Sequence, residues 1–150
     1  MTADTPVLQM LPELAANPEQ PVEIVGDDGV VIGTVGAGAL LGALDNMMSG
    51  PSADTSWVEM DVAASDYSAS AVARAVEDAD ATLLALVAEP DKEGVPMMHV
   101  SLHVDHADPS AVVHSLSRYG YDVRYASGGR NADLETARER YAALALYLNV

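Results

Sequence analysis

Residues 57–125 decide the fold of this chain, and they read WVEMDVAASDYSASAVARAVEDADATLLALVAEPDKEGVPMMHVSLHVDHADPSAVVHSLSRYGYDVRY. Apolar and polar side chains alternate along residues 57–62 and again along residues 98–104, which is the pattern of a strand with one buried face. Residues 82–88 are apolar on both sides, which favours a strand covered on both faces, where a partner chain can supply one of the covers. Residues 121–125 complete a set of four predicted strands.

Two helices are predicted between these strands. The first begins near Asp66-Tyr67-Ser68, where Asp66 and Ser68 are suited to capping a helix N-terminus. The second has Asp108-Pro109 at its start and Gly120 just past its end. The order strand-helix-strand-strand-helix-strand is that of the βαββαβ, ferredoxin-like fold, which more often senses or pairs than catalyses. The expected buried stripes of the helices are Val72, Ala75, Val76 and Ala79, and then Val112, Val113 and Leu116.

The first 50 residues predict a smaller domain of the order helix-strand-strand-helix. Its first helix is expected to be short or bent, because Pro12 falls within its first two turns. The expected elements are a helix after Thr5-Pro6, strands at 22–25 and 30–34 around a turn at Asp28-Gly29, and a helix at 37–48.

The predicted fold class is therefore α+β, with two domains. The first domain covers residues 1–50, a small polar linker covers 51–56, and the second domain covers 57–150. Within the second domain, residues 127–131 are predicted to form a mobile connection. Residues 133–148 follow as an extra C-terminal helix, because their apolar side chains recur at heptad-like spacing.

Composition narrows the possible chemistry. The chain has no Cys, which excludes disulfides, thiolate metal sites and cysteine nucleophiles. No apolar run approaches the ~18 residues of a membrane span, and the first residues lack a basic region typical of export signals. We therefore expect a cytoplasmic protein that does not bind a membrane.

The charge balance is extreme, with 23 acidic side chains, one Lys and a net charge of −16. Such a chain repels the phosphates of nucleic acids at long range, so no nucleic-acid partner is expected. One explanation is an acidic surface with a function; the other is the solubility adaptation of a halophilic proteome. The acids are spread along the chain and Lys is nearly absent, which favours the halophilic explanation.

Several motifs resemble a known family. Pro21-Val22-Glu23-Ile24-Val25 and Val31-Ile32-Gly33-Thr34-Val35 look like the core of one CBS (cystathionine-β-synthase) motif. The second domain resembles an ACT-like domain. The motifs that carry the whole resemblance, to CBS-domain proteins of Bacteroidetes-type bacteria, are Asp66-Tyr67-Ser68, Arg118-Tyr119-Gly120-Tyr121, Glu139-Arg140-Tyr141 and Tyr147-Leu148-Asn149-Val150.

The resemblance has a consequence for assembly. Family members generally carry two CBS motifs before the ACT-like part, whereas this chain resembles only the second motif. A single CBS motif exposes the sheet face that normally packs on its twin. The chain therefore either pairs with a motif in another chain, which makes a homodimer the expected assembly, or is a fragment.

In the CBS-like domain, the resemblance points to Thr34, Gly36 and Gly38 as ligand-binding residues. Nucleotide-binding CBS motifs place a hydroxyl on the phosphate and a carboxylate on the ribose, and Gly36 and Ala39 occupy those two positions here. A ribose without its carboxylate loses a hydrogen bond worth about 1.5–3 kcal/mol. Backbone amides of residues 36–38 at a helix start can still receive an anion. We therefore expect weak adenine-nucleotide binding or none.

In the ACT-like domain, the resemblance points to the turn that contains Asp66, Tyr67 and Ser68 as an amino-acid site. Such turns usually contain a Gly that lets backbone amides approach the ligand, and Ala69 stands roughly at its position. A purely capping role for Asp66 and Ser68 is the alternative.

The histidines invite a metal hypothesis. His99 and His103 share one face of a strand, but they lie ~13 Å apart at ~3.3 Å per residue, too far to hold one ion. If the strands have the usual ferredoxin-like order, Glu59 and Asp61 lie beside this face, and a ladder of histidine and carboxylate pairs results. We expect no metal site, no catalytic residue and no cofactor.

The sequence therefore predicts a non-catalytic regulatory protein. It would sense an adenine nucleotide or an amino acid through a CBS and ACT-like homodimer, whose arrangement a ligand shifts. The alternative is a ligand-free dimerisation and assembly module in which both binding sites are degenerate.

Overall fold

The computed structural model describes residues 1–48, 54–127 and 143–144. The chain is an α+β protein that divides into two compact units, residues 1–49 (the N-terminal unit) and 50–150 (the sheet unit), and each is described by itself. Half of the predicted linker (51–53), nearly all of the predicted connection at 127–131 and, apart from residues 143–144, the predicted C-terminal helix lie outside the described residues.

The N-terminal unit has the predicted order helix-strand-strand-helix. Pro12 lies inside the first helix, which is ten residues long. Its two strands pair antiparallel and are joined by a turn in which Gly29 has a positive φ of 77°, a conformation that glycine adopts without strain. The bounds are α1 Val7–Ala16, β1 Val22–Val25, β2 Val31–Val35 and α2 Ala37–Met48.

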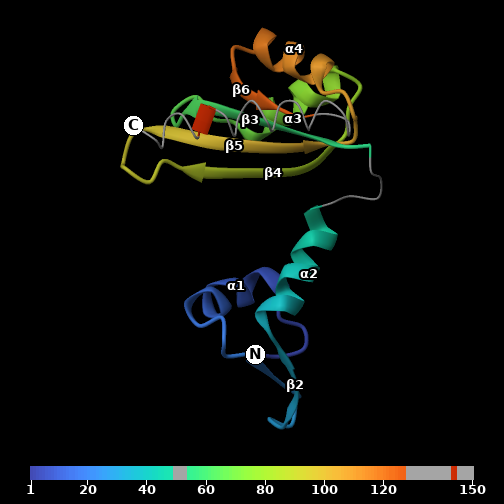
Figure 1. Ribbon diagram of the computed structural model, residues 1–150, viewed down its shortest axis with the longest axis vertical. Coiled ribbons are helices and arrows are strands. Elements are labelled where there is room, and N and C mark those ends of the chain that lie inside the picture. The colour runs from blue at the N-terminus through green and yellow to red at the C-terminus, as the bar shows by residue number, and fades with distance from the viewer. Residues whose placement is uncertain (49–53, 128–142, 145–150) are drawn as a thin grey trace. The chain divides into compact units, whose positions relative to one another are not determined.

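The sheet unit has the predicted order strand-helix-strand-strand-helix-strand (Figure 1). Its four strands form one antiparallel sheet in the order β4-β5-β3-β6, so the first and third strands of the unit are central. The bounds are β3 Ser56–Ala63, α3 Ala69–Asp78, β4 Leu83–Pro90, β5 Met97–Val104, α4 Ser110–Arg118 and β6 Asp122–Ala126.

Strand β4 continues two residues past its predicted end, to Pro90. A proline lacks the N–H that a central strand needs, but β4 is an edge strand, where that N–H is not required by a second neighbour. One face of β4 packs on the core, and Val87 on the other face is 44% exposed. The predicted second cover for this strand stays a prediction.

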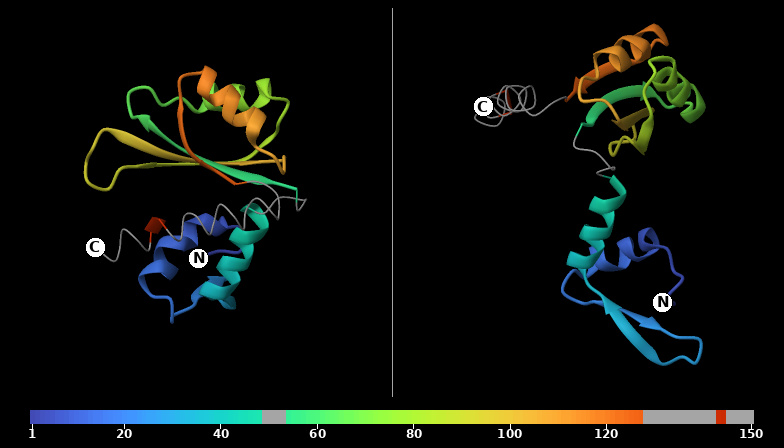
Figure 2. Two further views of the ribbon diagram at one scale, coloured as in Figure 1. Left: turned by 45° about the horizontal axis from the view of Figure 1, so that its top comes forward. Right: turned by 90° about the vertical axis from the view of Figure 1, so that its right-hand side faces the viewer.

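Helices α3 and α4 lie side by side on one face of the four-stranded sheet (Figures 1 and 2). The strands direct alternate side chains to this inner face, so the predicted inward residues of β3 and β5 meet the apolar stripes of both helices. Ser115 of α4 is also buried, and its hydroxyl donates to the carbonyl of Ala75 in α3 at 2.5 Å. The buried core consists of Val58, Met60, Val62, Val72, Ala75, Val76, Ala81, Val100, Leu102, Val104, Val112 and Leu116.

The helix ends follow the sequence signals closely. Ser68 is the N-cap of α3 and its hydroxyl accepts from the Ala71 amide at 3.4 Å, whereas Asp66 stands outside the cap. Asp108 accepts from the Ser110 amide at 2.9 Å at the start of α4. Gly120 follows α4 with a φ of 87°, which lets the chain turn into β6. Among the described residues, none of the helices combines the length and apolar character needed to cross a bilayer.

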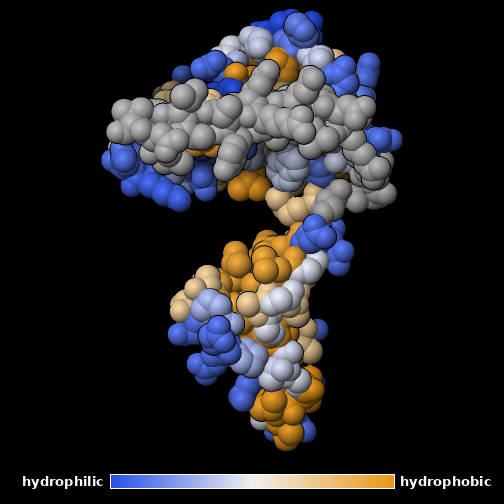
Figure 3. Space-filling view, in the orientation of Figure 1, coloured by the Kyte–Doolittle hydropathy of each residue, from blue (hydrophilic) through white to orange (hydrophobic). Residues whose placement is uncertain are grey.

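The N-terminal unit encloses its core less completely. Its buried apolar residues are Met10, Leu14, Val22, Ile24 and Leu40. Figure 3 shows apolar side chains gathered on the surface of this unit, whereas most of the visible described surface of the sheet unit is hydrophilic. The large exposed apolar residues of the unit are Met1, Leu8, Leu11, Val30, Val31, Ile32, Leu41 and Met47.

Candidate functional site

The outer face of the sheet, opposite α3 and α4, carries the polar side chains of the strands in three rows. Strands β4, β5 and β3 are aligned so that each row takes one residue from each strand. Because paired residues of antiparallel strands point to the same face, each row forms a line of neighbouring side chains. The rows are Ala85, His103 and Trp57; Val87, Ser101 and Glu59; and Glu89, His99 and Asp61.

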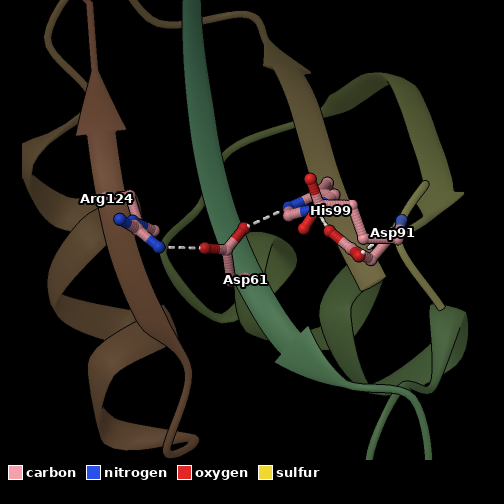
Figure 4. Close-up of polar contacts among 5 residues, drawn as sticks. Asp61, Asp91, His99 and Arg124 are labelled. Carbon is pink, nitrogen blue, oxygen red and sulfur yellow. Dashed lines mark hydrogen bonds and ion pairs between the residues drawn. The ribbon is translucent and has the colours of Figure 1, made fainter. Parts of the chain in front are cut away.

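The third row is the centre of a chain of four ionic side chains (Figure 4). His99 Nδ1 lies 2.6 Å from Asp61 Oδ1, and His99 Nε2 lies 3.0 Å from Asp91 Oδ1. The second oxygen of Asp61 accepts a hydrogen bond from the Arg124 guanidinium. These four side chains therefore alternate in charge from β6 through β3 and β5 to the end of β4. Their contacts confirm the predicted histidine–carboxylate ladder at this row.

Arg124 reaches this row from strand β6, which pairs with β3. Its neighbour Val123 packs on the core, so the alternation of the strand directs Arg124 to the outer face, where it contacts Asp61. The pairing of β6 with β3 then shifts between Glu59 and Met60, which is a β-bulge, and Tyr125 stands opposite Glu59.

The hydrogen bonds of His99 favour its protonated form. Both ring nitrogens face carboxylate oxygens, which accept hydrogen bonds when ionised, so this arrangement stabilises the imidazolium, in which both nitrogens donate. The hydrogen bonds to Asp91 and then Asp61 accordingly raise the pKa of His99 above its ordinary value. The side chain remains 43% exposed, so solvent and solutes can reach it.

The two carboxylates respond in the opposite direction. Partial burial alone would raise the pKa of Asp61, but the hydrogen bonds from His99 and Arg124 outweigh it and hold the pKa below its ordinary value. The pKa of Asp91 is lowered by its hydrogen bond to His99 and by the Glu93 amide, which donates at 2.9 Å. Both carboxylates are therefore ionised throughout the neutral range.

The third row borders a hollow of about 420 Å³ on the outer face. This volume falls within the range of small-molecule sites in proteins. Among the described residues, no three His, Cys, Asp or Glu side chains converge in a geometry that could hold a metal ion. The lining residues are Glu59, Met60, Asp61, Glu89, His99, Val100, Ser101 and Arg124.

The first row has a different character. His103 is only 1% exposed, and its ring stacks on Trp57 with centroids 4.5 Å apart and planes 11° from parallel. The sequence predicted His103 as part of a solvated or partner-facing polar surface together with His99, and the structure corrects this for His103. Trp57 covers one face of this buried ring, whereas His99 is 43% exposed, so the two histidines of β5 have different environments.

The residues predicted for a nucleotide site lie in the N-terminal unit. Thr34 borders a hollow of about 500 Å³, together with Glu13 and Glu23. Gly36 begins α2, where its carbonyl accepts from the Leu40 amide at 3.1 Å, and Gly38 is exposed to open space. The first 49 residues contain seven acidic side chains and no Lys, Arg or His, so this unit offers a phosphate no cationic side chain.

The residues predicted for an amino-acid site play separate roles. Ser68 caps α3, and Tyr67 packs against the core of the sheet unit. Asp66 borders a small hollow of about 270 Å³ beside Gly120 and Asp122. None of the six predicted ligand-binding residues lines the hollow of the outer face.

The sequence missed Glu89, Asp91 and Arg124 as members of the candidate site. Glu89 and Asp91 were within reach of prediction, because consecutive antiparallel strands around a short connection bring the end of β4 beside the start of β5. Glu89 thereby pairs with His99. Arg124 was not, because its contact with Asp61 depends on the register of β6 against β3.

Comparison with known proteins adds no family assignment, since no protein-family model matches the chain and no curated protein matches it significantly in sequence.

Proposed function

We propose that this chain is a non-catalytic regulatory protein that binds a small molecule and works as a homodimer. In this proposal the N-terminal unit is a single CBS motif and the sheet unit is an ACT-like domain. The observation that carries the proposal is the hollow on the outer sheet face, which is lined by Asp61, His99 and Arg124 from three strands, with Asp91 bonded to His99 beside it (Figure 4). Small-molecule sites combine such a concavity with a few convergent polar groups.

The charges of the two units favour an amino acid over an adenine nucleotide. A nucleotide brings phosphates, and the N-terminal unit has no basic side chain to receive them. The outer-face hollow offers carboxylates to an ammonium group and Arg124 to a carboxylate, so it can receive both ends of an amino acid. The proposed ligand site is therefore this hollow, away from Thr34, Gly36 and Gly38.

A thermal-shift screen of amino acids and adenine nucleotides tests the proposal. A ligand that binds only the folded state must raise the melting temperature in a concentration-dependent manner. Glu89→Gln, in the hollow, should reduce the shift, whereas Glu77→Gln, exposed on α3, should leave it unchanged. A shift produced by nucleotides and insensitive to Glu89→Gln would contradict the proposed site.

The exposed apolar surface of the N-terminal unit favours a second candidate, an assembly module without a ligand. Ile32 is 62% exposed and Leu41 is 67% exposed, and contiguous apolar surface of this kind marks interfaces. Light scattering in molar salt should show a dimer that Ile32→Asp dissociates, whereas Val95→Asp, in the sheet unit, should not. A dimer together with a screen that finds no ligand would favour this second candidate.

A further inference from the structure

The outer-face hollow has a surplus of negative charge around His99. Three carboxylates line the hollow and a fourth, Asp91, bonds the His99 ring beside it, against one guanidinium and the imidazolium itself, which leaves two negative charges. An anionic ligand would add to this repulsion, whereas a cationic one would relieve it. The groups are Glu59 and Asp61 on β3, Glu89 on β4, Asp91 after β4, and Arg124 on β6.

The hollow already holds one organic cation, which belongs to the chain. The imidazolium of His99 bridges Asp61 and Asp91 with a hydrogen bond from each nitrogen, at 2.6 Å and 3.0 Å. Because the ring is 43% exposed, this cation sits at the rim of the hollow and is not locked in the core. The two carboxylates are therefore stabilised by a cationic hydrogen-bond donor that lies between them.

We infer that the hollow binds a small molecule bearing a primary ammonium group in addition to that of an ordinary amino acid, and that this ammonium replaces the imidazolium as the charged donor to Asp61 and Asp91. The inference rests on the proposed function and names its ligand class. An ammonium is a compact charge with three donors, so it can satisfy both carboxylates at once. Once the ligand ammonium occupies the two carboxylates, they no longer stabilise the imidazolium. His99 therefore releases one proton to solvent when the ligand binds.

Binding and protonation of His99 are consequently antagonistic. Protonation of His99 and binding of the ligand share one coupling free energy. A condition that favours the imidazolium, such as lower pH, must therefore weaken the binding of the ligand. One released proton corresponds to a change in affinity of up to about tenfold per pH unit while His99 is largely protonated. The side-chain ammonium of a lysine-like ligand stays charged over this range, so the pH dependence reports on the protein.

Calorimetric titration with L-lysine and L-norleucine tests the inference. L-Norleucine has the same carbon chain without the second amine, so it isolates the contribution of that group. We expect L-lysine to bind more tightly than L-norleucine and to gain affinity between pH 6 and pH 8. Buffers of different ionisation enthalpy should reveal the released proton, and the His99 ring resonances should move toward those of neutral imidazole on saturation.

Variants locate the effect. His99→Gln should flatten the pH dependence, and Asp61→Asn should weaken L-lysine by about tenfold or more. Glu89→Gln, which changes an exposed carboxylate of the hollow, should also weaken L-lysine. Glu77→Gln on α3 should bind L-lysine like the parent chain. Equal affinity for the two amino acids, or an affinity unchanged with pH, would overturn the inference while the proposed function stands. If no small molecule binds, both fall.

Discussion

The two units of this chain differ in how fully each encloses its own apolar residues. Among the residues that the structure describes, two helices of the sheet unit cover one face of a four-stranded sheet, and twelve residues form a buried core. In the described part of the N-terminal unit, two helices and a two-stranded hairpin bury only five apolar residues, while Val31 and Ile32 of β2 stay exposed. A two-stranded hairpin is marginal without a covering layer, so we expect the N-terminal unit to be less stable by itself than the sheet unit.

Charge follows the same division. The first 49 residues carry seven acidic side chains and no basic one, whereas the remaining 101 carry sixteen acids and all seven Lys and Arg residues. The sheet unit can therefore build ion pairs such as Asp61 with Arg124, and the N-terminal unit has no Lys, Arg or His side chain with which to form them. The unit that encloses its core less completely also has fewer means to offset repulsion.

The largest effect should come from the core of the sheet unit. Leu102 is completely buried on β5, so Leu102→Ala should lower the free energy of unfolding by about 2–5 kcal/mol through lost burial and the cavity left behind. Trp57, the only tryptophan, reports this transition by fluorescence in urea. Val87→Ala, on the exposed face of β4, should cost far less, and equal costs would contradict the assignment of the two faces.

The matched substitution in the N-terminal unit should separate the two units. Leu14 is 2% exposed, so Leu14→Ala should remove much of the stability of that small core. Amide protons of α1 and β1 should then exchange rapidly, while the Trp57 transition stays at the same urea concentration. A large shift of the Trp57 transition would show that the two units unfold together.

A smaller effect is expected where α3 meets α4. The Ser115 hydroxyl satisfies the Ala75 carbonyl near the C-terminal end of α3, in a fully buried position. Ser115→Ala leaves that carbonyl without this donor, which should cost about 1–3 kcal/mol in urea unfolding. Ser117→Ala, exposed on the same helix, is the control, and similar costs for both variants would argue against the buried hydrogen bond.

Salt should distinguish the units further. The Debye length falls from ~30 Å at 0.01 M to ~3 Å at 1 M, which screens repulsion between neighbouring carboxylates. We expect added KCl to stabilise both units, by an amount on the order of 1 kcal/mol, and the N-terminal unit more per residue. Hydrogen exchange between 0.05 and 2 M KCl measures this, and flat stability would favour a local function for the acidic surface.

The smallest effect should be the pH dependence of the sheet unit. Because the pKa of His99 is raised in the folded state, its contribution to stability is fully present below the ordinary imidazole pKa and is lost as pH rises through the raised value. The stability difference between the parent chain and His99→Gln should therefore shrink from pH 6 to pH 9. His114→Gln, exposed on α4, is the control, and a constant difference would contradict the ionic chain.

Element order and the inner face could be predicted from residues alone. The apolar residues Val58, Met60 and Val62 recur every second residue, which is the period of a strand. This period places the three side chains on the same face of the sheet. Local hydrogen bonds likewise explain Ser68 and Gly120, whose roles require only nearby backbone. The pairing of His99 with Asp61 followed once a strand order was assumed.

Only the tertiary structure decided what the outer face contains. Arg124 reaches Asp61 because β6 pairs with β3, and this pairing depends on how two strands distant in sequence align. His103 is buried and stacks on Trp57 of the next strand, although its own strand places it on the same face as the exposed His99. Sequence period determines the face to which a side chain points, whereas its partners on that face depend on register between strands, which no single strand encodes.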